Sequence, residues 1–289
     1  VRLLHKAGVP VPSLQFLPGD GATVGAALTS DPRVAGVCFT GSTDTARLIR
    51  SNMARHLAPS ATLIAETGGL NAMIVDSTAL PEQAVRDIVA SAFQSAGQRC
   101  SALRCLYVQD DIAPHLTEML TGAMQELTLG DPWSLSTDIG PVIDDEAATG
   151  IRAHIDAARR EGRVIAEMIA PATGHFITPP VIRVNGIADL KREVFGPVLH
   201  LATFRSEDLS RVVADINATG YGLTFGLHTR IESTVAEVRQ RVRVGNMYVN
   251  RNQIGAVVGA QPFGGEGLSG TGPKAGGPHY LSRFATERV

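Results

Sequence analysis

Strand-like and helix-like segments alternate along almost the whole chain, and this alternation constrains the fold more than any single motif. Short apolar runs at 34–40, 62–65, 73–75 and 103–108 are separated by stretches whose apolar residues recur at helical spacing. Such alternation is typical of βα units, in which each helix carries the chain back across a parallel sheet. The sequence therefore predicts an α/β fold with a mostly parallel sheet.

Further segments continue this pattern, and one long segment interrupts it. Residues 251–278 are rich in glycine and show little apolar periodicity. A loop of that length in a compact protein is usually functional. The remaining expected elements are helices at 22–28, from Gly41-Ser42 onward, from Pro81 to Gly97 and near 144–161, 207–218 and 231–242, and strands at 13–17 and near 198–204, 223–228 and 246–250.

The overall composition limits the classes of function. The 289 residues are 44% hydrophobic and 19% charged, with a formal net charge of -2, which is typical of a soluble globular protein. This charge gives no electrostatic case for a nucleic-acid or anionic-membrane partner. No apolar run reaches the roughly 18 residues that span a bilayer, and the first residues have no signal-peptide pattern. We therefore expect no membrane segment.

The three cysteines are interpreted in two ways. An odd, low count favours a reducing compartment such as the cytoplasm, and no cysteine or histidine shows the spacing of metal ligands. Cys38 and Cys105 lie inside apolar runs and are interpreted as small buried residues. Cys100 has polar neighbours, among them Arg99, whose charge would favour the thiolate. A thiol between a helix end and a strand can act as a nucleophile, and a core position is the alternative.

A carboxylate with distinctive neighbours follows the strand expected at 62–65. Glu66 is followed by Thr67-Gly68-Gly69 and is expected at the carboxyl edge of a sheet, where ligands gather in open α/β folds. Glu66 can serve as a general base if its surroundings raise its pKa toward neutrality. A solvated turn residue is the alternative. None of the eight histidines stands where it would suggest a base paired with Cys100.

Two segments near the start are candidates for binding phosphate. Thr40-Gly41-Ser42 leads from a strand into a helix, where free backbone N–H groups and the helix dipole attract anions. A plain N-cap by Ser42 is the alternative. Gly19-x-Gly21-x-x-x-Gly25 follows an expected strand, but it misses the usual dinucleotide-binding spacing by one residue. Neither segment determines a ligand by itself.

Two later motifs combine an aromatic residue with glycine. Glu193-Val194-Phe195-Gly196-Pro197 can present a carboxylate and a flat ring to a nucleoside, and an ordinary turn with a core phenylalanine is the alternative. Pro262-Phe263-Gly264-Gly265 has the backbone freedom of a loop that folds over a cleft.

Taken in order along essentially the whole chain, these motifs resemble those of the NAD(P)-dependent aldehyde dehydrogenase superfamily. GQRCSALR, and the segment from Asn250 to Pro278 with the following His279, look most like the glutamate-γ-semialdehyde (pyrroline-5-carboxylate) dehydrogenases. Among these, they look most like the dehydrogenase module of bifunctional bacterial proline-utilisation flavoproteins. The motifs that carry the resemblance are Phe39-Thr40-Gly41-Ser42-Thr43, Glu66-x-Gly68-Gly69, Gly97-Gln98-x-Cys100, Glu193-x-Phe195-Gly196-Pro197 and Pro262-Phe263-Gly264-Gly265.

The resemblance implies a fold and an activity. The fold would be aldehyde dehydrogenase-like, with part of a Rossmann-type NAD-binding domain at 1–66, a catalytic domain at 67–265 and a segment returning to the cofactor side at 266–289. The activity would be oxidation of L-glutamate γ-semialdehyde to L-glutamate, with Cys100 as the nucleophile and Glu66 activating the water that hydrolyses a thioester. The implied cofactor is NAD, and NADP is left open.

The resemblance also implies binding roles for further positions. Glu193 would bind the nicotinamide ribose, and Phe195 would pack beside it. The α-carboxylate of the substrate would be held by Ser101 with the backbone at Gly255 and Ala256, and Phe263 would line its aliphatic chain. The other implied cofactor contacts are Gly21, Gly25, Phe39, Thr40, Gly41, Ser42, Thr67 and Gly68.

Other implications concern the surroundings of this chain. Proline-utilisation proteins are longer and also carry a proline dehydrogenase module, and FAD would belong only to that module. An oxyanion-hole asparagine and a lysine that binds the adenosine ribose would precede Val1, and an extension that helps to build a homo-oligomer would follow the last helix. We therefore expect this chain alone to bind NAD weakly, to turn over poorly and to self-associate.

Two other functions remain open on the sequence. The same cysteine and glutamate would serve a broad-specificity aldehyde dehydrogenase or a thioester hydrolase, and esterase activity without NAD would favour the hydrolase. A non-catalytic assembly module that kept the fold is the third alternative. A thiol probe that failed to label Cys100 in preference to Cys38 and Cys105 would favour that module.

Overall fold

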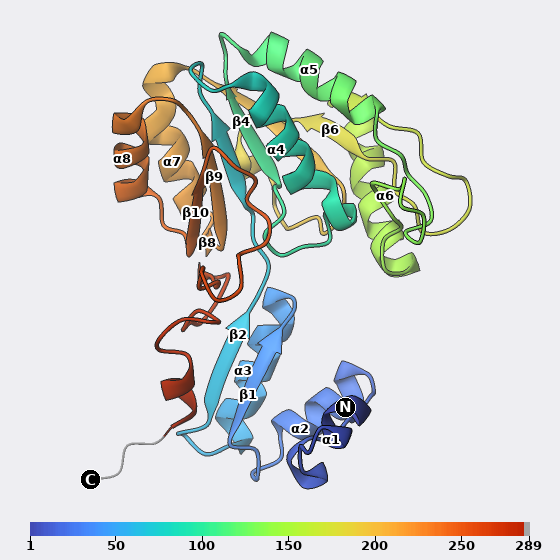
Figure 1. The fold of residues 1–289 in the computed structure, drawn as a ribbon, viewed down its shortest axis with the longest axis vertical. Helices are drawn as coiled ribbons and strands as arrows, with labels where there is room; N and C mark the ends of the chain where they lie inside the picture. The colour runs from blue at the N-terminus through green and yellow to red at the C-terminus, as the bar shows by residue number, and fades with distance from the viewer. Residues whose placement is uncertain (286–289) are drawn as a thin grey trace. The chain divides into compact units, whose positions relative to one another are not determined.

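The computed structural model describes residues 1–285, which form two compact units, residues 1–65 and the residues from Glu66 onward (Figure 1). The expected domain boundaries lay after residues 66 and 265. The last four residues of the expected segment 266–289 lie outside the described residues. Each unit is described by itself below.

The smaller unit consists of α-helices of 4 to 14 residues and a two-stranded sheet. Helical turns at Gly21–Gly25 and α2 at Ala26–Thr29 confirm the helix expected at 22–28, and Ser42 begins α3 as expected. The strand expected at 13–17 is wrong, because prolines at 10, 12 and 18 remove backbone donors and a 3-10 turn forms at Val11–Ser13 instead. The other elements of this unit are α1 (Arg2–Lys6), β1 (Gly36–Thr40), α3 (Thr43–His56) and β2 (Thr62–Glu66), with β1 paired to β2.

The expected burial of Cys38 is also wrong. Cys38 lies on β1 and is exposed. Along β1, intermediate positions alternate with exposed ones, so neither face of this strand is fully covered. The apolar composition of the strand therefore did not indicate a core position. Cys105, by contrast, is fully buried as expected.

The larger unit is an α/β sheet with helices on both faces, which confirms the predicted mostly parallel fold. Its seven strands follow the order β10-β9-β3-β4-β7-β6-β5, and all neighbouring pairs are parallel except β5 with β6. The strands are β3 (Ala72–Val75), β4 (Cys105–Gln109), β5 (Val164–Glu167), β6 (Pro180–Arg183), β7 (Leu199–Phe204), β9 (Thr224–His228) and β10 (Asn246–Val249).

Alternating side chains of the central strands build two separate cores. Met73 and Val75 of β3 face one cluster, and Ala72 and Ile74 face the other, because successive side chains of a strand point to opposite faces. The first cluster contains residues of α4 (Pro81–Phe93), α5 (Ala113–Gln125) and α6 (Asp145–Arg160), and the second contains residues of α7 (Leu209–Ala218) and α8 (Glu232–Arg241). Both faces of the sheet are therefore covered (Figure 1).

Several elements of this unit, among them β5, β6 and α5, have no counterpart in the expectations. The proline that begins β6 weakened the strand pattern there. The proline in the first turn of α5 favours a helix start, a signal that the sequence analysis did not use. A two-stranded antiparallel ribbon pairs β8 (Tyr221–Gly222) with β11 (Glu266–Gly267). Short 3-10 turns lie at Gln94–Gly97, Ile187–Asp189, Ser206–Asp208 and Leu281–Phe284. Within residues 1–285, no helix has both the length and the apolar character needed to cross a bilayer.

Candidate active site

Three segments that precede neighbouring strands carry most of the expected chemistry of the larger unit. Residues 66–71 lead into β3, residues 97–104 lead into β4, and residues 193–197 lead toward β7. Because β3, β4 and β7 are parallel neighbours, their amino ends bring these segments together. The site therefore lies at the amino ends of the central sheet, although Glu66 itself ends β2 as expected.

The turn that carries Cys100 has an unusual backbone. Helix α4 ends at Phe93, and not at Gly97 as expected, and Ser95, Ala96 and Gly97 then all adopt left-handed conformations with φ of 57°, 53° and 64°. Left-handed serine and alanine are uncommon, and such strain persists only where the surrounding structure enforces it. A Cβ at Gly97 would overlap the carbonyl oxygen of Gly196. The close approach of the two loops therefore requires glycine at position 97.

Burial and nearby negative charge act on the thiol. Burial, the charge of Glu193 and, to a smaller extent, the charge of Glu66 raise the pKa of Cys100, while backbone N–H groups at Ser101 and Cys100 lower it. The expected effect of Arg99 does not set this direction. The Arg99 guanidinium instead donates through Nε to Ser95 Oγ at 3.0 Å. Cys100 therefore needs a base close to it to act as a nucleophile at neutral pH.

Asn71, which the sequence analysis did not identify, anchors the thiol turn to the sheet. Its Nδ2 donates to the carbonyl oxygens of Cys100 at 2.7 Å and Ala102 at 2.9 Å, and its Oδ1 accepts from the N–H of Thr224 at 3.1 Å. Ser101 is buried, and its carbonyl oxygen accepts from Thr224 Oγ1 at 3.1 Å. The turn is therefore attached at the thiol residue and at the two residues that follow it.

Glu66 has the environment of a general base. Its Oε2 accepts from the N–H of Gly265 at 2.8 Å, and its Oε1 is buried without a hydrogen-bond partner among the described residues. Burial raises the pKa of Glu66 to about 7, although the Gly265 N–H and the Lys274 charge oppose this shift. A carboxyl group with a pKa near neutrality can both accept and release a proton. The solvated-turn alternative therefore does not describe this residue.

The long glycine-rich segment returns to Glu66 and encloses it. Gly270 forms a β-bridge with Glu66, and the Thr67 N–H donates to the carbonyl oxygen of Ser269 at 2.9 Å. Thr67 Oγ1 donates to the carbonyl oxygen of Leu268. A Cβ at Gly270 would lie 2.7 Å from Glu66 Oε1. The segment thus accepts hydrogen bonds from both donors of Thr67, its backbone N–H and its hydroxyl, although Thr67 was expected at the cofactor.

Glu193 is held by an arginine that the sequence analysis did not identify. Arg104 is 1% exposed, and its Nη2 lies 3.1 Å from Glu193 Oε1. Burial raises the pKa of Glu193, while Arg104 and the Gly69 N–H lower it. The sequence did contain a signal for this pair. Arg104 is a charged residue inside the apolar run 102–106, and a buried arginine needs a partner.

Gly68 and Phe195 complete the surroundings of Glu193. A Cβ at Gly68 would overlap Glu193 Oε2, so only glycine permits this approach. The Phe195 ring is 44% exposed, and the Arg104 guanidinium lies 5.2 Å from its centroid. The ring thus offers an open face beside the carboxylate, and the core alternative for Phe195 is wrong.

The expected substrate residues lie around the same turn. Gly255 is exposed and left-handed, and a Cβ there would be 3.7 Å from Arg99 Nη1. Ala256 and Phe263 are partly buried, and Phe263 forms a β-bridge with Ala275. Arg99 therefore brings a positive charge to the segment that was expected to hold a carboxylate.

The remaining expected cofactor positions belong to the smaller unit. Gly21 and Gly25 bound a helical stretch, and Phe39 and Thr40 end β1. A Cβ at Gly41 would overlap the Phe39 ring. Ser42 Oγ accepts from the Thr45 N–H at 3.1 Å, so Ser42 is the N-cap of α3.

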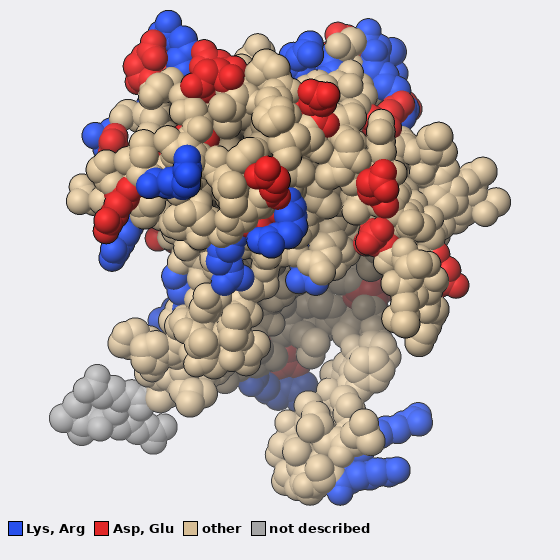
Figure 2. Space-filling model, turned by 45° about the horizontal axis from the view of Figure 1, so that its top comes forward, with Lys and Arg blue, Asp and Glu red and all other residues tan. Residues whose placement is uncertain are grey.

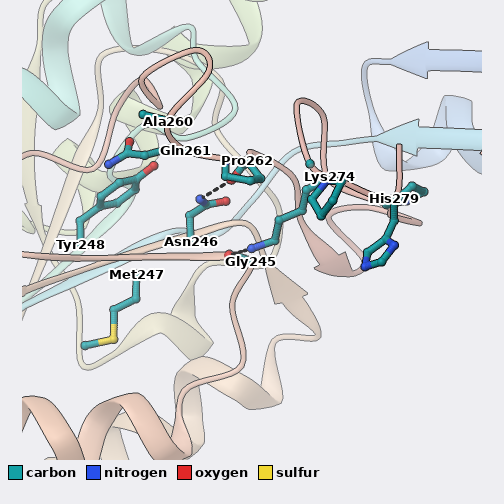
Figure 3. A pocket seen from close by; sticks show the side chains of 12 residues that line it. Gly245, Asn246, Met247, Tyr248, Ala260, Gln261, Pro262, Lys274 and His279 are labelled. Atoms are coloured by element: carbon teal, nitrogen blue, oxygen red, sulfur yellow. Dashed lines mark hydrogen bonds between the residues drawn. The ribbon is translucent and has the colours of Figure 1, made fainter. Parts of the chain in front are cut away.

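A cavity of about 700 Å³ lies away from the thiol (Figure 3). It is lined by residues 245–248, 260–262, 273–274 and 277–279, and Cys100 is not among them. Asn246 Nδ2 donates to the carbonyl oxygen of Pro262 at 3.0 Å, and Lys274 donates to the carbonyl oxygen of Gly245. These contacts hold the glycine-rich segment against β10, so that Lys274 supports the loop that encloses Glu66.

The charged side chains on the surface reflect the nearly equal numbers of acidic and basic residues in the sequence. Acidic and basic side chains are mixed over the face of the larger unit that Figure 2 shows, without a broad patch of one sign.

Across residues 1–285, no group of three or more histidine, cysteine or acidic side chains could hold a metal ion. His154 and His200, 46 positions apart, do meet with Nε2 atoms 2.9 Å apart, a pairing that no sequence spacing indicated.

Comparison with known proteins decides the family. The sequence profile described as "Aldehyde dehydrogenase family" matches residues 1–289. The chain belongs to the aldehyde dehydrogenase family. This confirms the resemblance that the ordered motifs indicated.

Individual relatives of this aldehyde dehydrogenase-family chain have two kinds of name. The "Bifunctional protein PutA" of Klebsiella aerogenes is 56% identical over 299 residues, covering 100% of this chain and 23% of the relative. A "1-pyrroline-5-carboxylate dehydrogenase" of Geobacillus kaustophilus is 39% identical, covering 97% of this chain and 55% of the relative. The chain thus spans about a quarter of the first relative's length and about half of the second's.

Solved structures agree with the sequence comparison. A crystal structure of bifunctional proline utilization A (PutA) matches with a TM-score of 0.96 and 55% identity, covering 99% of this chain and 29% of that one. A 1-pyrroline-5-carboxylate dehydrogenase from Thermus with bound NAD matches with a TM-score of 0.91 and 34% identity, covering 98% of this chain and 55% of that one. The aldehyde dehydrogenase fold is therefore shown for this chain.

Proposed function

We propose that this chain carries the catalytic thiol and base of an NAD-dependent dehydrogenase that oxidises L-glutamate γ-semialdehyde to L-glutamate. The observation that carries the proposal is the environment of Glu66: burial raises its pKa to about 7, one of its oxygens is buried without a partner among the described residues, and its charge has a small effect on the pKa of Cys100. The names of the relatives support the substrate, and the NAD-bound Thermus relative supports the cofactor.

The first step is attack by sulfur on the aldehyde carbon. Ionised Glu66 takes the proton of Cys100, directly or through a water molecule, and the sulfur forms a bond to the carbonyl carbon. The carbonyl oxygen becomes an alkoxide, which the backbone N–H of Cys100 partly stabilises, as donors of an oxyanion hole do. Asn71 orients the peptide groups of this turn by holding the carbonyl oxygens of Cys100 and Ala102.

Bound NAD would supply the acceptor for the hydride of the hemithioacetal, and a thioester on Cys100 would remain. Glu193 and Phe195 fit its nicotinamide riboside, because the Phe195 ring is exposed and a carboxylate oxygen has lone pairs beyond the one that Arg104 uses. Gly41 and Ser42 would lie near the pyrophosphate, and Ser42 would do so while it caps α3. Gly21, Gly25, Phe39 and Thr40 of the smaller unit, and Thr67 and Gly68 of the larger unit, would be further cofactor contacts.

Water then releases the product. Glu66 accepts a proton from water as the water oxygen attacks the thioester carbon, and the carbon–sulfur bond breaks to give the carboxylate and free Cys100. One aldehyde, one water and one NAD thus yield one carboxylate, reduced NAD and two protons. The cycle needs Glu66 to be ionised when water attacks.

Substrate selection rests on the segments around the thiol. Gly255 and Ala256 would present backbone N–H groups to the α-carboxylate, with Ser101, and Phe263 would line the aliphatic chain. Arg99 supports this assignment, because its guanidinium lies beside Gly255 and charge-assisted hydrogen bonds to carboxylates are strong.

Several features of the whole protein are part of the same proposal. A separate proline dehydrogenase module that uses FAD would accompany this one, as the bifunctional relatives suggest. The protein would be a cytoplasmic homo-oligomer. The present chain alone would bind NAD weakly, turn over poorly and self-associate, because large apolar side chains of its smaller unit, such as Leu3 and Phe16, are exposed.

The test combines turnover with detection of the covalent intermediate. The chain is mixed with NAD and either glutamate semialdehyde or an aliphatic aldehyde, and NADH formation and the intact mass are measured. We expect oxidation that prefers the semialdehyde and an acyl adduct on Cys100, both lost by at least ~10³-fold in Cys100→Ala. The rate should be about 100- to 1,000-fold below that of a complete module, if one oxyanion donor is missing.

Other outcomes identify the alternatives. Ester hydrolysis without NAD, and no NADH formation, would favour a thioester hydrolase. Equal rates with both aldehydes would favour a broad-specificity enzyme. Light scattering that showed a clean monomer at micromolar concentration would contradict self-association. Unchanged aldehyde oxidation in Cys100→Ala would refute the proposed mechanism altogether.

A further inference from the structure

Arg104 stands out among the polar groups that the proposed reaction leaves without a role. It is 1% exposed, and its guanidinium donates to four acceptors on two loops. Nη1 donates to the carbonyl oxygens of Gly97 at 2.8 Å and Gly196 at 3.2 Å. Nη2 donates to the carbonyl oxygen of Arg99 at 3.1 Å and to Glu193 Oε1 at 3.1 Å. Each terminal nitrogen thus joins the thiol turn to the Glu193 loop.

The positions of these acceptors matter for Cys100. Arg99 directly precedes the thiol residue, and Gly97 ends the left-handed stretch before it. Their carbonyl oxygens are drawn toward one guanidinium, while Asn71 holds the carbonyl oxygen of Cys100 itself. The planar fork of arginine can satisfy several acceptors in fixed directions, which an ammonium group cannot.

The charge of Arg104 also acts on Glu193 and Cys100. Glu193 is the nearby carboxylate that most opposes ionisation of Cys100, and Arg104 interacts with both groups. A buried arginine is costly unless paired. An arginine that is buried next to the two proposed functional groups therefore needs a reason other than packing alone.

We propose that Arg104 is a positioning residue, which holds the thiol turn and the Glu193 loop at a fixed separation and compensates the Glu193 charge that faces the thiol. Arg104 touches no reacting atom and acts through Gly97, Arg99, Gly196 and Glu193. The inference rests on the proposed nucleophilic role of Cys100. Its effect can nevertheless be measured without aldehyde or NAD.

The measurement is the pH dependence of Cys100 alkylation by iodoacetamide. The thiolate displaces iodide, so that a carbon–sulfur bond forms as the carbon–iodine bond breaks, and the rate follows the ionised fraction of the thiol. A Cys38→Ser background removes the exposed thiol, and buried Cys105 should react slowly. Peptide mass analysis assigns the label to Cys100.

The variants separate charge from packing. Arg104→Met removes the charge and keeps an apolar side chain, and it should raise the alkylation midpoint by about one pH unit, which is ~10-fold slower labelling below the midpoint. Arg104→Lys keeps the charge and should keep the midpoint within about 0.3 units, because it loses mainly the bonds to the carbonyl oxygens. An unshifted midpoint in Arg104→Met, or equal shifts in both variants, would overturn the proposal.

A third variant tests the same ion pair from the carboxylate side. Glu193→Gln leaves the Arg104 charge unopposed near the thiol, and the midpoint should fall by about one unit. A midpoint that stayed unchanged would again overturn the proposal. The proposed aldehyde oxidation has its own test with Cys100→Ala, so its failure would leave these alkylation shifts intact and the two results can be told apart.

Discussion

Glu66 and Glu193 are two partly buried glutamates of the same unit, and their carboxylates have different hydrogen-bonding partners. Glu66 has a single backbone donor and one buried oxygen without a partner within residues 1–285, and burial raises its pKa to about 7. Burial also raises the pKa of Glu193, but Arg104 and the Gly69 N–H oppose that shift. The comparison teaches that a missing partner makes a carboxyl group a proton acceptor, whereas a fixed partner makes it part of the framework.

The substitution Glu66→Gln is the strongest test of this comparison. Its effect is measured as the rate at which an acyl group is released from Cys100. The thiol is loaded once with an activated acetyl donor in the Cys38→Ser background, and the loss of the acetyl mass is timed. We expect deacylation to slow by about 10²- to 10⁴-fold, because general-base catalysis typically contributes this much. The wild-type rate should rise with pH through about 7, where Glu66 loses its proton.

The pH dependence supplies the control for this prediction. In Glu66→Gln the rise through pH 7 should disappear, because glutamine cannot accept the proton. A variant that kept the rise would assign the titration to another group. An unchanged deacylation rate would contradict the role of Glu66 as base.

The second prediction compares the stability of the two glutamine variants. Glu193→Gln leaves the buried Arg104 without its counter-charge and should lower the free energy of unfolding by about 3 to 5 kcal/mol. Glu66→Gln breaks no ion pair and should have little cost. Above pH 7 it should even stabilise, because the raised pKa means that ionisation of Glu66 weakens the fold there. Urea unfolding at pH 8 gives both values, and equal losses would refute the distinction.

A third prediction concerns the glycine that lets Glu193 approach. Gly68→Ala places a Cβ against Glu193 Oε2, and we expect a loss of about 1 to 3 kcal/mol in unfolding free energy. The control is Gly122→Ala on the exposed side of α5, where the Cβ meets nothing within 4 Å. That change should stabilise the chain by about 0.5 to 1 kcal/mol. Similar effects of the two substitutions would show that the site is not closely packed at position 68.

The smallest effect at neutral pH is expected from the pair of His154 and His200, to which no carboxylate within residues 1–285 is hydrogen bonded. His200 Nδ1 lies 2.9 Å from the carbonyl oxygen of Arg104, and burial lowers the pKa of His200 to about 4. Because the unfolded state binds the proton more readily, stability should fall as the pH decreases from about 6.5 to 4. The charged groups Arg104 and Arg163 act on His200 in the same direction, as does His154.

Replacing His200 by leucine should flatten this dependence. We expect the wild type to lose on the order of 3 kcal/mol between pH 6.5 and 4 through this residue, and urea titrations at several pH values measure the slope. At pH 7 the free energies of unfolding of the wild type and the leucine variant should differ by less than this amount. A variant with the full wild-type slope would show that other groups govern acid stability.

Much of the fold could be predicted from the sequence, because alternating apolar patterns reflect burial directly. The helices at 145–160, 209–218 and 232–241 and the central strands lie within a few residues of their expected positions. The failures have local causes. Prolines prevented the strand expected at 13–17, and an apolar strand in the small two-stranded sheet left Cys38 exposed.

The motifs of the candidate site could be predicted from the sequence, but the residues that hold these motifs in place could not. Local residue types marked Cys100, Glu66 and Glu193. Asn71, Arg104 and Lys274 could not be assigned roles, because their partners lie on other segments, as Arg104 and Glu193 do at 89 positions apart. The left-handed stretch before Cys100 was also hidden, because neither serine nor alanine indicates it.

The sequence by itself determined the alternation of strands and helices, the order of the motifs and hence the family, because these depend on residue type and near spacing. Only the tertiary structure decided which carboxylate is paired and which is not. The neighbouring positions of β4 and β7 in the sheet bring Arg104 to Glu193, and the return of the glycine-rich segment brings the Gly265 N–H to Glu66. Burial and partner charge, which set the protonation of each group, exist only once the chain has folded.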